Sequence, residues 1–158
     1  MPIKFFPVNL LIVGLILFPN ILSAIFQPVN IPTNLDRPAW WAVVIVFEWI
    51  GRLGILILPL FWEIRFDKSK IIFLVLFGMM IALYYTCWIR FFLHGREFRL
   101  LFEPILGIPI PMAISPILAV LFLGVAQNSS LVLTAAVIMA LGHSPESLQN
   151  LYSARFLK

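Results

Sequence analysis

Hydrophobic residues form long continuous runs along this chain, and short stretches rich in proline, charged and polar residues separate them. Runs of this length predict membrane-spanning helices over about 8–26, 39–64, 71–93, 105–127 and 129–143, followed by an interfacial helix over 145–157. A membrane β-barrel would instead show alternating segments of about ten residues. The pattern predicts one all-α domain over 1–158, a polytopic transmembrane helical bundle of four or five spans with one proline-broken helix.

Composition agrees with this pattern. The chain is 62% hydrophobic and only 11% charged, whereas a soluble domain carries about 25% charged residues. The net charge of +4 does not indicate nucleic acid, because the basic residues lie at the ends of apolar runs, where they orient helices and meet head groups. Cys87 is the only cysteine, which excludes an intrachain disulfide and a cysteine-based metal site.

The run 39–64 carries the main anomaly. Trp40 and Trp62 bracket it, and a helix between them would rise roughly 33 Å at about 1.5 Å per residue, close to a hydrocarbon core of roughly 30 Å. Glu48 and Arg52 nevertheless lie in its middle, where a charge costs on the order of 3 kcal/mol. Their spacing of four residues favours an ion pair on one helix face.

Two glycines and a proline shape the same run. Gly51 and Gly54 would let another helix approach closely, so we expect a contact there with another helix, a partner protein or a second copy. Pro59 would free the carbonyl of Ile55 and kink the span.

The second half of the chain is less regular. The stretch 96–103 is amphipathic and predicts a short helix in the membrane interface. Four prolines in 104–116 exclude one regular helix, and Ser115 followed by Pro116 predicts the start of the next helix. The apolar segments 116–127 and 131–142 either cross the membrane as two kinked spans or form a re-entrant hairpin. Ser144 and Pro145 predict a further helix start.

Following the predicted spans in order places most polar candidates at the same end of the bundle. We therefore expect a polar cavity that opens to the membrane face on which the loop 27–38 lies, with Glu48 and Arg52 as its floor. The candidate ligand-binding residues are Glu48, Arg52, Arg90, His94, Arg96, Arg99, Glu103 and His143.

Simpler interpretations stay open for each of these residues. Glu48 and Arg52 would then only fix helix packing, the charges of 90–103 would meet lipid head groups, and His143 would cap a helix. The two histidines lack the spacing of a metal site, so none is predicted. No Walker loop, G-x-S-x-G or G-x-G-x-x-G motif is present, so the sequence predicts no catalytic residue or cofactor.

Several segments resemble a small family of bacterial multi-span membrane proteins with no known activity. They are EWIGRLG (48–54), the stretch 84–101, FEPILGIPIP (102–111) and Gly142 with His143. This resemblance implies a location in the bacterial cytoplasmic membrane. The size and the five tryptophans also resemble the tryptophan-rich sensory (translocator) protein family, five-helix binders of porphyrins or sterols, although that family's tryptophan- and proline-rich loop signature is missing here.

Three functions follow as expectations. The first is binding or translocation of a small anionic or amphipathic molecule such as a lipid. The second is a membrane enzyme that acts on a lipid-like substrate through a His/Glu acid–base pair. The third is a structural subunit that packs through Gly51 and Gly54 on a partner or as a homo-oligomer.

Overall fold

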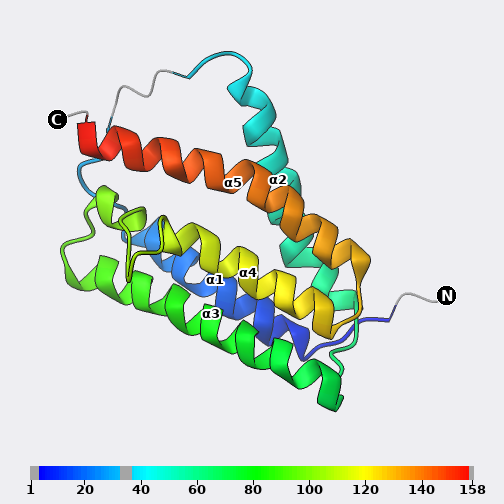
Figure 1. Ribbon diagram of the computed structural model, residues 1–158. Coiled ribbons are helices and arrows are strands. Elements are labelled where there is room, and N and C mark those ends of the chain that lie inside the picture. Colours follow the sequence, from blue (N-terminus) through cyan, green and yellow to red (C-terminus); the bar gives the residue numbers. More distant parts are fainter. Residues whose placement is uncertain (1–3, 33–36, 157–158) are drawn as a thin grey trace.

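The computed structural model describes residues 4–32 and 37–156, and within them the chain is helical (Figure 1). The elements in order are α1 (Asn9–Ile25), α2 (Trp41–Ile57), the 3-10 helix η1 (Leu58–Phe61), α3 (Lys68–Leu93), the 3-10 helix η2 (Phe98–Leu101), α4 (Pro111–Ala126) and α5 (Ser130–Phe156). Among the described residues the β-structure consists of two isolated bridges, Val29 with Glu97 and Ile105 with Ile108. The predicted all-α fold is confirmed.

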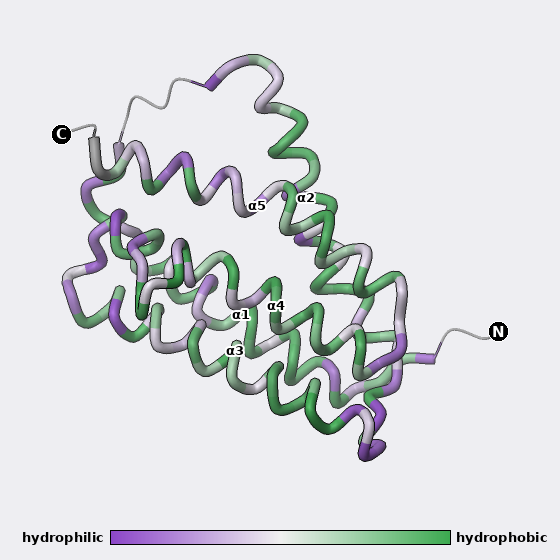
Figure 2. Tube along the Cα trace, in the orientation of Figure 1, coloured by the Kyte–Doolittle hydropathy of each residue, from purple (hydrophilic) through white to green (hydrophobic). Residues whose placement is uncertain are grey.

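Three helical segments are long and apolar enough to span a membrane: Trp41–Phe61, Lys68–Leu93 and Ser130–Ala154. The apolar helices α1 and α4 are shorter and lie beside α3. Apolar residues predominate in α1 to α4 and in the first half of α5, whereas polar residues gather in the connecting segments and the second half of α5 (Figure 2). The chain is a membrane protein by these features, as its composition predicts.

Glycines bring α2 and α5 into close contact where the two helices cross. A Cβ atom on Gly51 would lie 2.3 Å from the backbone nitrogen of Met139, and one on Gly142 would lie 2.2 Å from that of Glu48. Gly54 faces Ala135 in the same way. The small-residue face that we expected to meet another helix therefore meets α5 of the same chain.

The remaining helices pack around this pair in a second layer. α3 packs on α4, and α4 packs on α5, whereas α1 contacts α3 and η1. Because α4 is almost completely buried, it forms the centre of the bundle. α4 and α5 run antiparallel to each other (Figure 1); α5 is long and apolar enough to span a membrane, whereas α4 is shorter.

Three predicted boundaries are wrong. Ser144 and Pro145 do not start a new helix, because α5 continues through them from Ser130 to Phe156; a proline removes one backbone hydrogen bond, and the packing of Gly142 on α2 holds the helix across it. α4 begins at Pro111, whose fixed φ suits a first helical position, so Ser115 and Pro116 lie inside it.

The expected interfacial helix over 96–103 is also shorter, with only Phe98–Leu101 in η2. Gly95 and Arg96 both have positive φ angles, 78° and 58°, which a right-handed helix excludes.

The carbonyl groups at the proline breaks find partners inside the bundle. The side-chain amide of Asn9 donates to the carbonyls of Pro59 and Trp62 at 2.7 and 2.8 Å, and that of Gln127 donates to the same two carbonyls at 2.9 Å each. Pro19 cannot donate to the carbonyl of Leu15, which instead accepts the hydroxyl of Tyr85 at 2.9 Å. These contacts satisfy backbone groups that lipid would leave unpaired.

Candidate functional site

Glu48, Arg52 and His143 meet in the middle of the bundle. One carboxylate oxygen of Glu48, Oε1, pairs with Nη2 of Arg52 and with Nδ1 of His143, the latter at 2.9 Å. Gly142 makes this possible, because it lets the backbone of α5 touch α2 beside Glu48. The expected pair on one helix is thus a group of three that joins two helices.

The contact with Glu48 indicates which ring nitrogen of His143 donates a hydrogen bond. Since a carboxylate only accepts hydrogen bonds, Nδ1 carries a proton, and Nε2 is left to face other groups. The Glu48 side chain is 12% exposed and that of His143 is 22% exposed, whereas the Arg52 side chain is 41% exposed. Glu48 is therefore more buried than the guanidinium of Arg52 and the imidazole of His143, and both of these groups can form further hydrogen bonds.

Arg52 and His143 line a cavity of about 280 Å³ that all five α-helices enclose. Its volume lies just below the usual range for ligand pockets, roughly 300–1,000 Å³. Most lining side chains are apolar. The polar ones are Asn20, Ser23, Arg52, Tyr84, His143 and Ser147. An apolar chamber with a few convergent polar groups is typical of a small-molecule site.

The wall opposite Arg52 is built around Tyr84, which sequence reasoning did not single out. Its hydroxyl accepts from the side-chain amide of Asn20 at 2.7 Å and donates to the carbonyl of Ile16 at 3.2 Å. The same amide also donates to Ile16 at 2.8 Å. The signals in the sequence were an asparagine directly after Pro19 and the polar-aromatic second half of the span 71–93.

One end of the cavity is covered. Leu101 and Phe102 belong to its lining, and Phe102 packs against the buried cluster of Ile110, Ala113 and Leu151. Phe102, the residue after η2, thus contacts α4 and α5 at the end where we expected an opening.

The other predicted ligand-binding residues do not line this cavity. Arg90 instead donates from Nη2 to the carbonyls of Leu100 and Glu103 at 3.0 and 3.1 Å. It thereby holds the segment after η2 against the end of α3. His94 is exposed, with Nδ1 2.9 Å from the carbonyl of Arg90.

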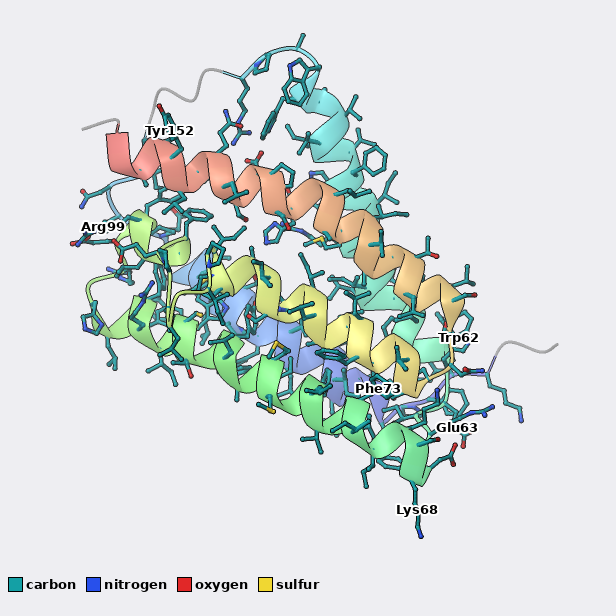
Figure 3. The ribbon with its side chains drawn as sticks, in the orientation of Figure 1. Trp62, Glu63, Lys68, Phe73, Arg99 and Tyr152 are labelled. Atoms are coloured by element: carbon teal, nitrogen blue, oxygen red, sulfur yellow. The ribbon has the colours of Figure 1, made fainter. Side chains whose placement is uncertain are left out.

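Arg99 and Glu103 lie in the same segment. Arg99 pairs with Glu97 at 2.5 Å and with Glu103 at 3.4 Å, and its side chain points away from the bundle (Figure 3). The hydrogen bond and charge of Glu97, with the charge of Glu103, raise the pKa of Arg99. Arg96 occupies the left-handed turn that leads into η2. Arg99, Glu97 and Glu103 therefore form a charged surface at the end of the bundle, whereas Arg90 binds backbone carbonyls of the same segment.

A further polar cluster escaped sequence reasoning. Glu146 pairs with Arg37 and accepts the indole N–H of Trp41 at 2.6 Å. Asn150 lies 3.5 Å from the same carboxylate. Trp41 therefore ties the start of α2 to α5.

The described residues contain no cluster suited to a metal ion, and the chain matches no known protein family. Among the described residues, no group of three or more His, Cys, Asp or Glu side chains could hold a metal ion. Comparison with protein-family models, curated proteins and solved structures finds no match to this chain. The family resemblances drawn from the sequence therefore remain predictions.

Proposed function

We propose that this protein binds a small amphipathic molecule with an anionic group in the cavity between its helices. One observation carries the proposal: Arg52 and His143 line a mostly apolar chamber and are held there by one oxygen of Glu48. The apolar walls suit the body of such a ligand, and the cationic and imidazole groups suit its polar head.

The hydrogen-bonding inventory supports an anion. A guanidinium group has five N–H donors, and in Arg52 the interaction with Glu48 uses Nη2 alone. The remaining donors can form paired bonds to a carboxylate or phosphate. Glu48 balances the charge of Arg52 while the site is empty, which lowers the cost of holding an arginine at this depth.

Binding is better supported than translocation. A translocated molecule would have to leave at the far end of the bundle. There the amides of Asn9 and Gln127 tie α1 and α4 to the carbonyls of Pro59 and Trp62. We also propose that the chain is a multi-pass protein of the bacterial cytoplasmic membrane, which the three apolar helices and the sequence resemblance support.

The test is mass spectrometry of the protein purified in mild detergent, to identify small molecules that copurify with it. We expect an acidic amphipathic molecule that Arg52→Gln loses and Arg99→Gln retains. Arg99 is the matched control because its ion pairs lie on the surface. The proposal would be contradicted if both variants retained equal amounts of the molecule. It would also be contradicted if no such molecule copurified with the unaltered protein or with either variant.

An enzyme that acts on a lipid-like substrate is the second candidate. The 2.9 Å contact between Glu48 and His143 favours it, because a carboxylate that orients an imidazole is the usual support of a general base. His143→Gln would then abolish turnover while leaving ligand binding in place. A protein that binds its ligand but never converts it would exclude this candidate.

A further inference from the structure

Arg52 has an unusual position for a charged residue. It lies in the middle of the apolar segment Trp41–Phe61, yet its side chain is 41% exposed. Its guanidinium carbon lies 5.5 Å from the ring centroid of Trp49, and Trp49 is 58% exposed on the surface. Arg52 therefore reaches both the cavity and the outer surface of the bundle.

The packing of α1 explains this exposure. Both α1 and α2 contribute to the cavity lining, through Leu17 and Leu56 among others. They nevertheless pack on different partners: α1 on α3 and η1, and α2 on α5. Figure 1 shows the first half of α2 running away from α1. Both helices therefore line the cavity without an extensive contact with each other, and Arg52 lies on the α2 side of it.

The end of the cavity nearest the segment 94–110 is lined by apolar side chains. Leu101 and Phe102 line the cavity at the end that faces the loop 94–110, and Phe102 packs on α4 and α5 there. An anion from solution would have to pass these apolar side chains. Glu48 pairs with Arg52 through Nη2 alone, so the remaining N–H donors of this half-exposed guanidinium can meet a second anion.

From these observations, and resting on the proposed function, we infer that the ligand is a membrane-dissolved single-chain acid of the fatty-acid type that enters sideways between α1 and α2. Its carboxylate meets Arg52, and part of its chain fills the cavity. The small volume of about 280 Å³ fits a part of one chain better than a whole two-chain phospholipid. A phosphate-bearing single-chain lipid offers the same chemistry to Arg52.

Trp88 provides a probe inside the site. It lines the cavity and is only 6% exposed. We would replace Trp40, Trp41, Trp49 and Trp62 by Phe, which leaves Trp88 as the sole tryptophan. The protein would be placed in phosphatidylcholine vesicles that contain a fatty acid brominated on its chain, since bromine quenches nearby indole fluorescence. Brominated phosphatidylcholine at the same bromine content is the control for contact from outside.

We expect saturable quenching of Trp88 by the brominated fatty acid at low mole fraction, and much weaker quenching by brominated phosphatidylcholine. Arg52→Gln should weaken the fatty-acid effect about tenfold or more, because it removes charged hydrogen bonds, whereas Arg99→Gln should not. Iodide in the buffer should leave Trp88 unquenched. If the four-fold substitution prevents folding, the same signal is obtained as the difference between the unaltered protein and Trp88→Phe.

Other outcomes separate the two proposals. Strong quenching by iodide, together with thermal stabilisation by acetate or inorganic phosphate that Arg52→Gln abolishes, would mean that the anion comes from water. That result overturns lateral entry and leaves the proposed function standing. Equal quenching by the two brominated lipids would also overturn the inference. Failure of the fatty acid, acetate and phosphate alike to bind would overturn both.

Discussion

Glutamate and arginine side chains form ion pairs at two places in the bundle, in its interior and at one end, and the two sets of pairs differ. In the interior, Glu48 pairs with Arg52 and with His143, which is 95 residues away in the sequence. In the segment 94–103, Glu97, Arg99 and Glu103 pair with one another across two to four residues. The interior group joins two helices and faces a cavity, whereas the surface group holds only its own segment.

This difference follows from the solvent. Near the aqueous end, water competes for each charge, so ion pairs between neighbours contribute little. In the apolar interior, a charge needs a partner, and the partner must come from another helix or from the same helix one turn away. Polar contacts between helices should therefore contribute far more to the free energy of unfolding than contacts between neighbouring residues.

The largest effect should come from the helix crossing that creates the interior group. Gly51→Leu would place a side chain against the backbone of Met139, and we expect a loss of about 3 kcal/mol or more, or no folded protein. Gly78→Leu is the control, since a Cβ atom there meets nothing within 4 Å. Unfolding by denaturing detergent, followed by circular dichroism, measures both. Equal stabilities would mean that the tight crossing is not required.

The interior carboxylate should matter next. Glu48→Gln leaves Arg52 and His143 without their anionic partner, and we expect a loss of about 2 kcal/mol in the free energy of unfolding, since removing one member of a buried pair is costly. The expected loss is below that for a fully buried pair because Arg52 is 41% exposed. Glu97→Gln, on the surface, should cost less than about 0.5 kcal/mol. A reversed order would refute the comparison.

The amides at the Pro59 break should show coupling. Asn9→Leu and Gln127→Leu should each cost about 1 to 2 kcal/mol, because either amide still serves the carbonyls of Pro59 and Trp62 when the other is lost. The double variant should cost more than the sum, since both carbonyls then lack a side-chain donor. Simple additivity, measured by a double-mutant cycle, would show that the two amides act independently.

The smallest effect should come from Tyr85, whose hydroxyl serves the carbonyl that Pro19 leaves free. Tyr85→Phe should cost about 1 kcal/mol. In a Pro19→Ala background the helix can supply its own donor to Leu15, so the same change should become nearly neutral. An unchanged cost in that background would mean that the hydroxyl does not compensate for the proline.

The sequence was sufficient for features that depend on local composition. The length of the apolar runs identified the helices, and the spacing of Glu48 and Arg52 identified their pair. It was not sufficient for contacts that depend on helix crossing, such as the meeting of Glu48 with His143. The arginines around η2 were assigned to the site because they lie near the end of the bundle where we expected the cavity to open. In the structure, Arg90 donates to backbone carbonyls and Arg99 pairs with a neighbouring glutamate.

Helix boundaries failed for a related reason. Proline after serine is a good start signal in isolation, yet packing against neighbours keeps α4 and α5 continuous through Pro116 and Pro145. The partners of the freed carbonyls lie on other helices, as Tyr85 does for Leu15, and single-sequence reasoning cannot pair them. Tyr84, Asn20 and Glu146 were missed because their roles exist only in the assembled bundle.

The central claim is that Arg52 holds an acidic amphipathic molecule inside the bundle. Its most direct test is native mass spectrometry of the detergent-solubilised protein titrated with a medium-chain fatty acid. We predict one bound molecule per chain in the unaltered protein and in Arg99→Gln, and at least about tenfold weaker binding in Arg52→Gln. Binding of the same strength in all three proteins would contradict the claim.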